Sequence, residues 1–290
     1  MANYIATDTD LTAVANAIRT KGGTSAQLTF PQGFVDAIAA ISGGGGGLQL
    51  EDVLNRDVSG DIVLNITGQP TPTANAAGSQ FYGLAFSALF QQCGNITGIT
   101  VNGLKWVPQR FFCMNGTGNP QSNPALTSVS MPDAIFAGSR AFEGCINLVS
   151  ASFPSLQYAY QNYADIASNM FTGCSGLTSV DIGNIDRVGA NMFQNCSSLT
   201  SLELNAANYI YANAFSGATQ LATLVIHTSS VATLANVNAF NNSPFASGKA
   251  GGTLYVPSSL IASYQAATNW STILGYSTNN IVAIEGSEYE

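Results

Sequence analysis

The sequence is short of charge. Asp, Glu, Lys and Arg make up 8% of its 290 residues, against about 25% in an ordinary soluble domain. The 8 basic residues are outnumbered by 16 acidic ones. No basic cluster can neutralise a row of phosphates, so we expect no nucleic-acid partner. Uncharged polar groups must hydrate the surface instead, since Ser, Thr, Asn and Gln total 93 residues.

Several chemical signals are missing as well. There is one histidine, His227, which excludes multi-histidine metal sites and leaves one possible imidazole base. A sugar-processing enzyme would need a matched pair of carboxylates, and the sequence suggests none. We therefore predict no catalytic residue, no metal site, no cofactor and no enzymatic activity. No apolar run approaches the about 20 residues of a membrane span, and residues 1–5 lack the basic and apolar regions of a secretory signal peptide.

Residues 1–42 have the pattern of a small helical hairpin. The first helix follows Asp10 and ends at Lys21-Gly22-Gly23, and the second begins near Pro31, a favoured first helical position. Two helices this short cannot bury their apolar faces alone. We predict that they form an attachment or oligomerisation module; the alternative is that they fold back onto the main body. The apolar residues involved are Leu11, Val14, Ile18, Phe30, Phe34, Ile38 and Ile41.

A glycine run at residues 43–47 provides a flexible linker after this module. The order of residues from Leu11 to Gly23 and from Leu28 to Ile38 resembles a segment of tailed-phage tail, baseplate and fibre proteins. The resemblance covers about residues 10–41 and implies attachment to other virion proteins. By analogy with phage fibres it also implies a homo-oligomer, most plausibly a trimer.

The main body is built from an internal repeat. One unit reads Phe171-Thr-Gly-Cys174-Ser-Gly-Leu177-Thr-Ser-Val180-Asp-Ile182, and similar units start at Phe90, Phe142, Phe193 and Phe215, with a regular spacing of 22 residues from Phe171 to Phe215. The first three apolar positions, three residues apart, suit a helical turn or tight bend. The last two, two residues apart, suit a strand. One unit cannot bury its apolar edge alone, so the units must stack.

We therefore predict a mostly β fold with short helical turns, a solenoid of about 22-residue coils preceded by the helical hairpin. We assign residues 48–80 to an N-terminal cap and first strands, including a strand at Ile62–Leu64. Residues 81–256 form the repeat solenoid. Residues 257–290 form a C-terminal cap in which Trp270 and the strand Ile281–Ile284 cover the last coil.

The repeat unit resembles that of the BspA-like leucine-rich repeat family. Ala141-Phe142 and Ala214-Phe215 keep the alanine that precedes the phenylalanine in that family, and Gly252–Pro257 and Trp270 resemble its usual ending. The resemblance covers about residues 80–286. It implies a binding or adhesion protein with no catalytic residues to transfer.

Four of the five cysteines share one repeat position: Cys93, Cys145, Cys174 and Cys196. The same position holds Ala218 in the next unit, and the spacings match no zinc pattern. We predict free, buried thiols that act as small hydrophobic side chains. Disulfides and a metal site are the alternatives. Cys113 lies outside this column and stays undetermined.

Departures from the regular spacing predict three inserted loops. Phe112 to Leu126 spans 14 residues instead of 6, Phe153 to Phe171 spans 18 instead of 11, and Ile226 to Phe245 spans 19 instead of 11. Loops on a rigid scaffold often carry binding residues, and Tyr and Asn suit that role. The predicted receptor-binding residues are Tyr158, Tyr160, Tyr163, Asn115 and Asn119. Alternatively, the tyrosines pack on the neighbouring coil or form subunit contacts.

Together these features predict a non-enzymatic virion protein of a tailed phage, located at the tail or another external surface. The hairpin attaches it, and the repeats bind a host-surface carbohydrate or protein. Two alternatives remain open. One is a bacterial adhesin of the same repeat family, located at the cell surface. The other is a virion decoration protein with no receptor.

Overall fold

The computed structural model divides the chain into residues 1–58 and 59–290. It describes residues 59–65, 90, 94–107, 109–112, 125–159, 168–246, 249, 251–275 and 280–290. The predicted hairpin at residues 1–42 and the linker at 43–47 therefore lie outside the described residues. So do the predicted hairpin contacts Leu11, Val14, Ile18, Phe30, Phe34, Ile38 and Ile41.

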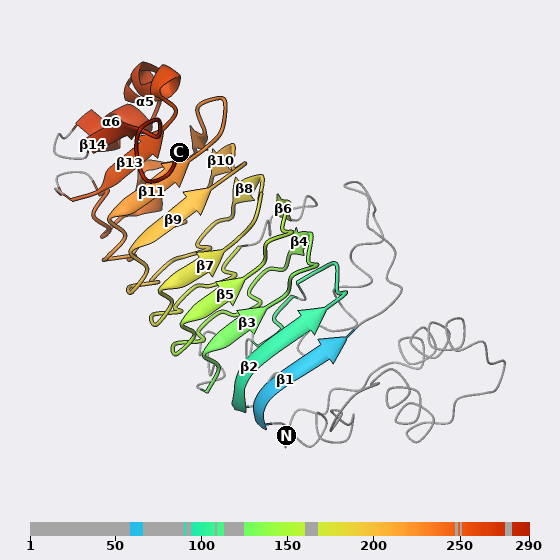
Figure 1. The fold of residues 1–290 in the computed structure, drawn as a ribbon. Helices are drawn as coiled ribbons and strands as arrows, with labels where there is room; N and C mark the ends of the chain where they lie inside the picture. Colours follow the sequence, from blue (N-terminus) through green and yellow to red (C-terminus); the bar gives the residue numbers. More distant parts are fainter. Residues whose placement is uncertain are drawn as a thin grey trace, which may run out of the picture. The chain divides into compact units, whose positions relative to one another are not determined.

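Parallel strands, one from each repeat, form a ladder in the second unit (Figure 1). Their side chains alternate, so that Val129, Ala151 and Leu202 point inward between outward-facing polar residues. The first sheet contains β1 (Ser59–Asn65), β2 (Asn95–Asn102), β3 (Ser128–Ser130), β5 (Ser150–Ser152) and β7 (Ser179–Asp181). The second contains β9 (Ser201–Leu204), β11 (Thr223–Ile226), β13 (Thr253–Val256) and β14 (Asn280–Ala283). The strand predicted at Ile62–Leu64 lies within β1.

A second row of two-residue strands follows the long strands. Each short strand pairs in parallel with its equivalent in a neighbouring repeat. They are β4 (Phe136–Ala137), β6 (Tyr158–Ala159), β8 (Arg187–Val188), β10 (Tyr209–Ile210) and β12 (Thr233–Leu234). The described part of the chain is thus mostly strand with few short helices, as expected of a leucine-rich repeat region.

The repeated phenylalanines stack in a buried column, as the sequence predicts. The ring centroids of Phe142, Phe171, Phe193 and Phe215 follow one another at 5.7, 5.5 and 5.7 Å, with interplanar angles of 12°, 13° and 3°. All four side chains are fully buried. A tight bend follows each ring: in one repeat, Cys145 N–H donates to the carbonyl of Phe142 and Leu148 N–H to that of Cys145, both at 3.1 Å.

The column continues through Phe240, and not through Phe245 as the predicted register has it. Phe240 stacks on Phe215 at 5.2 Å and 17°, and Phe245 lies beside Phe240 at a tilt of 43°. The reason is a 3₁₀ turn, η1 (Val237–Phe240), which begins after Asn236, whose side chain accepts a hydrogen bond from Asn238 N–H. Because of this turn, the phenylalanine that joins the column stands earlier in the sequence than the apolar spacing predicts.

Three short helices follow β13: η2 (Ser258–Leu260), α5 (Ile261–Ala266) and α6 (Trp270–Gly275). They carry two buried aromatic residues to the free edge of β12. Trp270 Nε1–H donates to the carbonyl of Ala232 at 2.6 Å, and Ala232 N–H donates to the Tyr264 hydroxyl at 3.0 Å. Asn269 Nδ2 donates to the carbonyl of Leu234 at 2.7 Å. Side chains therefore provide hydrogen-bond partners for backbone N–H and C=O groups at the edge of β12, where no further strand of the described residues pairs with it.

Candidate recognition surface

The short strands turn one side chain inward and one outward. In β8 and β10 the second residues, Val188 and Ile210, are buried, and the first residues, Arg187 and Tyr209, are half-buried. Arg187 and Tyr209 are register partners across the pair. Consecutive outward positions are about 4.8 Å apart, the distance between neighbouring strands. From β6 to β12 one outward side chain per repeat thus forms a row on this face, whereas the equivalent residue of β4, Phe136, is buried.

Three residues of this row, Tyr158, Arg187 and Tyr209, together with the neighbouring Tyr211, make up what we call the tyrosine–arginine strip. All four are half-buried. Arg187 Nη1 donates to the Tyr211 hydroxyl at 3.3 Å, and the rings of Tyr209 and Tyr211 are in contact, with centroids 4.5 Å apart. Asp186 Oδ2 lies 3.6 Å from Arg187 Nε. The Arg187 side chain remains 35% exposed, although its Nε atom is buried.

Tyr158 is the one predicted receptor-binding residue that the structure describes. It is half-buried in β6, and its ring stacks on Phe136 at 5.2 Å and 29°. It occupies a regular repeat position, as the register partner of Phe136, so its assignment to an inserted loop is wrong. This packing on a neighbouring repeat is the alternative considered for it. Tyr160, Tyr163, Asn115 and Asn119 lie outside the described residues.

Sequence reasoning missed three residues of this strip. Arg187 and Tyr209 each stand five residues after the last apolar strand position, Ile182 and Leu204, as Tyr158 does after Phe153. That shared offset was a readable signal. Departures from the regular spacing indicate inserted loops but do not reveal outward positions within the repeat.

Hydroxyl and thiol groups link successive repeats. Cys174 Sγ donates to the carbonyl of Phe142 at 3.1 Å, and Cys196 Sγ to that of Phe171 at 3.2 Å. The described cysteines Cys145, Cys174 and Cys196 are free and buried, as predicted. These cysteines do more than fill space, because the thiols of Cys174 and Cys196 donate hydrogen bonds to backbone carbonyls of the preceding repeat. Burial raises the pKa of both thiols.

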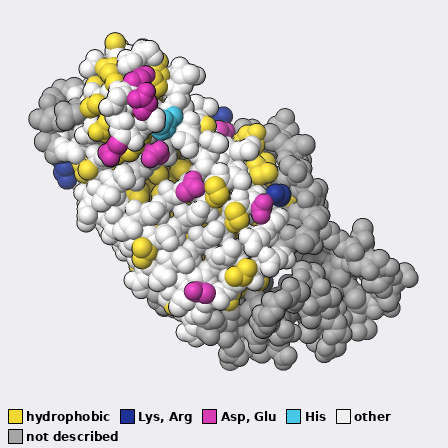
Figure 2. Space-filling view, in the orientation of Figure 1, with side chains coloured by type: hydrophobic (Ala, Val, Ile, Leu, Met, Phe, Trp, Pro, Cys, Tyr) yellow, Lys and Arg dark blue, Asp and Glu magenta, His cyan; other side chains and the backbone are white. Residues whose placement is uncertain are grey.

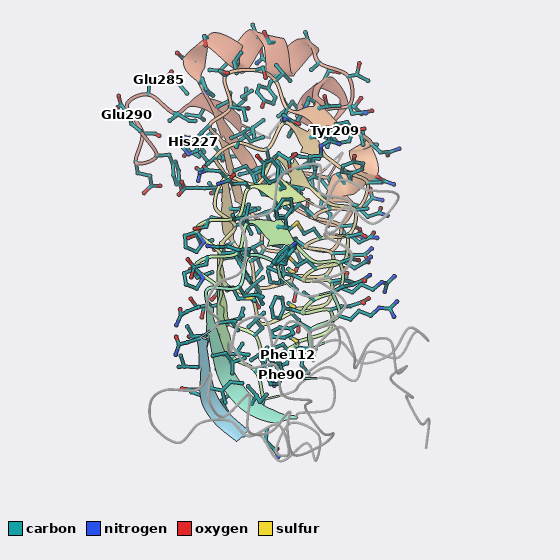
Figure 3. The ribbon with its side chains drawn as sticks, turned by 90° about the vertical axis from the view of Figure 1, so that its right-hand side faces the viewer. Phe90, Phe112, Tyr209, His227, Glu285 and Glu290 are labelled. Atoms are coloured by element: carbon teal, nitrogen blue, oxygen red, sulfur yellow. The ribbon has the colours of Figure 1, made fainter. Side chains whose placement is uncertain are left out.

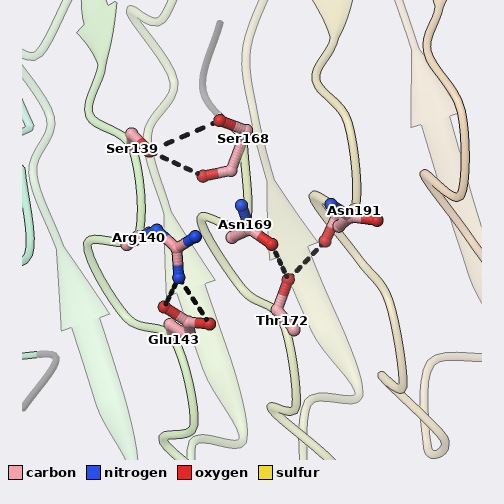
Figure 4. A network of polar contacts seen from close by, with 7 residues as sticks. All are labelled: Ser139, Arg140, Glu143, Ser168, Asn169, Thr172 and Asn191. Atoms are coloured by element: carbon pink, nitrogen blue, oxygen red, sulfur yellow. Dashed lines mark hydrogen bonds and ion pairs between the residues drawn. The ribbon is translucent and has the colours of Figure 1, made fainter. Parts of the chain in front are cut away.

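Polar side chains continue these links on the turns on either side of the phenylalanines (Figure 4). Ser139 Oγ donates to the carbonyl of Ser168 at 3.0 Å, and Thr172 Oγ1 donates to the carbonyl of Asn191 at 2.5 Å. Arg140 Nη1 contacts both carboxylate oxygens of Glu143, at 2.9 and 3.1 Å. This arginine is held by a carboxylate within its own turn, in contrast to Arg187.

Acidic side chains gather elsewhere, over the long strands toward the C-terminal end (Figure 2). Glu203 Oε2 lies 3.4 Å from His227 Nε2, and Glu285, Glu288 and Glu290 follow β14. Hydrogen bonds from its own N–H and that of Ser258 lower the pKa of Glu285. Figure 3 places His227, Glu285 and Glu290 on the side opposite Tyr209. His227, Glu285 and Glu290 therefore lie away from Tyr209.

No three His, Cys, Asp or Glu side chains within the described residues are grouped so as to hold a metal ion. No helix among them has the length and apolar character to cross a membrane.

Comparison with known families identifies the repeats. A model described as the BspA type leucine-rich repeat region matches residues 121–246 in six copies. A search of curated proteins finds no significant match. Residues 121–246 thus match the BspA type leucine-rich repeat, a class compatible with surface adhesion or protein binding. The family match does not extend to residues 1–42.

Proposed function

We propose that this chain is a non-enzymatic virion protein of a tailed phage that presents a leucine-rich repeat solenoid to a host-surface carbohydrate or protein. The observation that carries the binding role is the tyrosine–arginine strip. Tyr and Arg are enriched in binding hot spots because they offer rigid contact area and several hydrogen bonds. The family match supports the same general role. The parallel ladder and the stacked phenylalanines support the solenoid.

The virion assignment depends on residues 1–42, and its support is their resemblance to tailed-phage structural proteins. In this proposal the hairpin binds other virion proteins as a homo-oligomer, with a trimer as the expected state. Deleting residues 1–42 should prevent incorporation into virions while leaving the repeats folded. Incorporation of the truncated chain at the normal level would refute the attachment role.

The second proposal is a bacterial surface adhesin. The family match favours it, because BspA-type repeats are compatible with that role. The location of the protein separates the two: antibody labelling should mark purified virions under our proposal and the surface of bacterial cells under the second.

Cell binding tests the recognition role itself. Purified, fluorescently labelled protein is measured by flow cytometry against a panel of bacteria. Replacing Tyr158, Tyr209 and Tyr211 together by Ala should abolish the binding. Replacing Tyr255 and Tyr289, whose rings contact each other 4.8 Å apart on another face, should leave it unchanged. Absence of binding by the unmodified protein to every strain would favour a decoration role with no receptor.

A further inference from the structure

We propose that the tyrosine–arginine strip binds an acidic glycan, with sugar rings on the tyrosines and a sugar carboxylate on Arg187. This inference rests on the proposed binding function and names its ligand class. Its basis is the position of one exposed guanidinium in a row of half-buried rings, between the short strands that carry Tyr158 and Tyr209.

Arg187 has hydrogen-bonding capacity that its neighbours do not use. A guanidinium carries five N–H donors in a fixed plane and binds carboxylates through two of them at once. Among the described residues, its contacts are Nη1–H to the Tyr211 hydroxyl and the approach of Asp186 to Nε at 3.6 Å. These two contacts fix the plane of the group and leave further donors for a ligand. The 35% exposure of the side chain allows access to them.

The tyrosines supply flat surfaces on either side of this charge. Tyr209 is the register partner of Arg187, and β6, which carries Tyr158, is the neighbour of β8 on the other side. Consecutive positions are about 4.8 Å apart, close to the length of one pyranose residue in a chain. A sugar stacks its C–H face on an aromatic ring and donates its hydroxyls to polar neighbours. An extended glycan can therefore follow the row across several repeats.

The composition of this face favours a glycan over an acidic protein. Protein interfaces depend on a dry apolar centre that excludes water. The large aliphatic residues that are exposed in the described part of the chain are Val63, Ile146, Val149 and Val282. None of them lies on a short strand. Within the part of the chain that the structure describes, the strip offers rings and hydrogen-bonding groups, and no exposed large aliphatic residue lies on the short strands.

The distribution of charge is compatible with an anionic ligand. The protein has a net charge of −8, but Asp181 and Glu203 lie on long strands and Glu285 follows β14. Among the described residues, Asp186 lies next to the strip and is itself paired with Arg187. Asp186 thus limits the affinity for an anion, because its charge opposes that of the ligand.

The test is calorimetric titration of the full chain with matched pairs of oligosaccharides. The acidic members are oligogalacturonate and a sialylated oligosaccharide; the neutral members are their carboxyl-reduced and desialylated counterparts. We expect at least one acidic probe to bind and its neutral counterpart to bind weakly. Arg187→Gln should weaken acidic binding about ten- to hundred-fold, as expected for loss of charge-assisted hydrogen bonds. Asp186→Asn should strengthen it.

Arg140→Gln is the matched control, since Arg140 has similar exposure, 38%, but is held by Glu143. It should leave the affinity unchanged, and circular dichroism checks that all variants are folded. Equal binding of acidic and neutral probes, equal loss in both arginine variants, or failure of both acidic probes would overturn the inference.

A cell-binding measurement distinguishes failure of the acidic-glycan inference from failure of the proposed binding function. If cell binding survives periodate oxidation of surface sugars but not protease treatment, the receptor is a protein and only the glycan inference fails. If the protein binds no cells and no probe, both proposals fail.

Discussion

At the scale of single residues, Gly183 and Gly173 show two different reasons for glycine. Both have positive φ, +55° and +76°, where side chains are rarely tolerated. At Gly183 a methyl group would also lie 2.6 Å from the Pro154 carbonyl oxygen and 2.8 Å from that of Leu156. At Gly173 the nearest atom, Cα of Gly144, is 3.7 Å away. Gly183 is thus required by space as well as by backbone conformation.

Replacing each glycine by alanine tests this distinction. Gly173→Ala should lower the free energy of unfolding by about 1–2 kcal/mol, the cost of a left-handed alanine. Gly183→Ala should cost more, because the neighbouring repeat must also move. Urea unfolding monitored by circular dichroism measures both. Equal losses would show that the adjacent backbone shifts without cost.

The buried thiols make stability sensitive to alkaline pH. Above about pH 8.5 a thiol in the unfolded chain loses its proton, whereas Cys174 and Cys196 keep theirs when folded because burial raises their pKa. The unfolded state then binds fewer protons, so the free energy of unfolding falls as pH rises. The expected slope is about 1.4 kcal/mol per pH unit for each thiol.

A double variant, Cys174→Ala with Cys196→Ala, isolates this effect, since the same repeat position already holds Ala218. Its free energy of unfolding between pH 8 and 9.5 should fall less steeply than that of the unmodified protein. Parallel slopes would assign the pH dependence to other groups.

At the scale of elements, the sequence pattern was sufficient for the long strands and the tight bends. Alternation at Val180 and Ile182, and the three-residue spacing before them, correspond to β7 and the turn that precedes it. The pattern was insufficient for the outward positions. The apolar pattern locates buried side chains, but it does not indicate where within a repeat the inserted residues lie. For this reason the sequence wrongly places Tyr158 in an inserted loop. The same limit explains the choice of Phe245 over Phe240.

Trp270 is the largest of the side chains that join the described C-terminal helices to the last short strand. Trp270 combines ring packing against Phe240, at 6.0 Å, with a hydrogen bond to Ala232. Trp270→Phe should keep most of the packing and lose the bond, which leaves a buried acceptor and costs about 1–3 kcal/mol. Trp270→Ala should cost about 3–5 kcal/mol. Thermal unfolding by calorimetry ranks the two, and equal costs would show that the hydrogen bond carries the contact.

At the scale of the whole repeat region, stability is expected to spread through contacts between neighbours. Phe193 lies between Phe171 and Phe215 in the column. Phe193→Ala should cost about 3–5 kcal/mol and separate unfolding into two transitions, because the repeats on either side lose their shared ring. Phe245→Ala, a ring beside the column, should lower stability with a single transition. Urea curves read by tryptophan fluorescence and by circular dichroism should diverge for the first variant and coincide for the second.

Equivalent residues of successive repeats lie next to each other at a regular spacing. The length of the repeat region can therefore change by whole repeats. Asn191 and Asn213 occupy the same left-handed position in consecutive repeats. Removing residues 191–212 would therefore join two compatible ends and bring Phe171 onto Phe215. Gene duplication or loss of such a unit changes the reach of the protein, and the number of rings that it presents, by whole increments without redesign of either end.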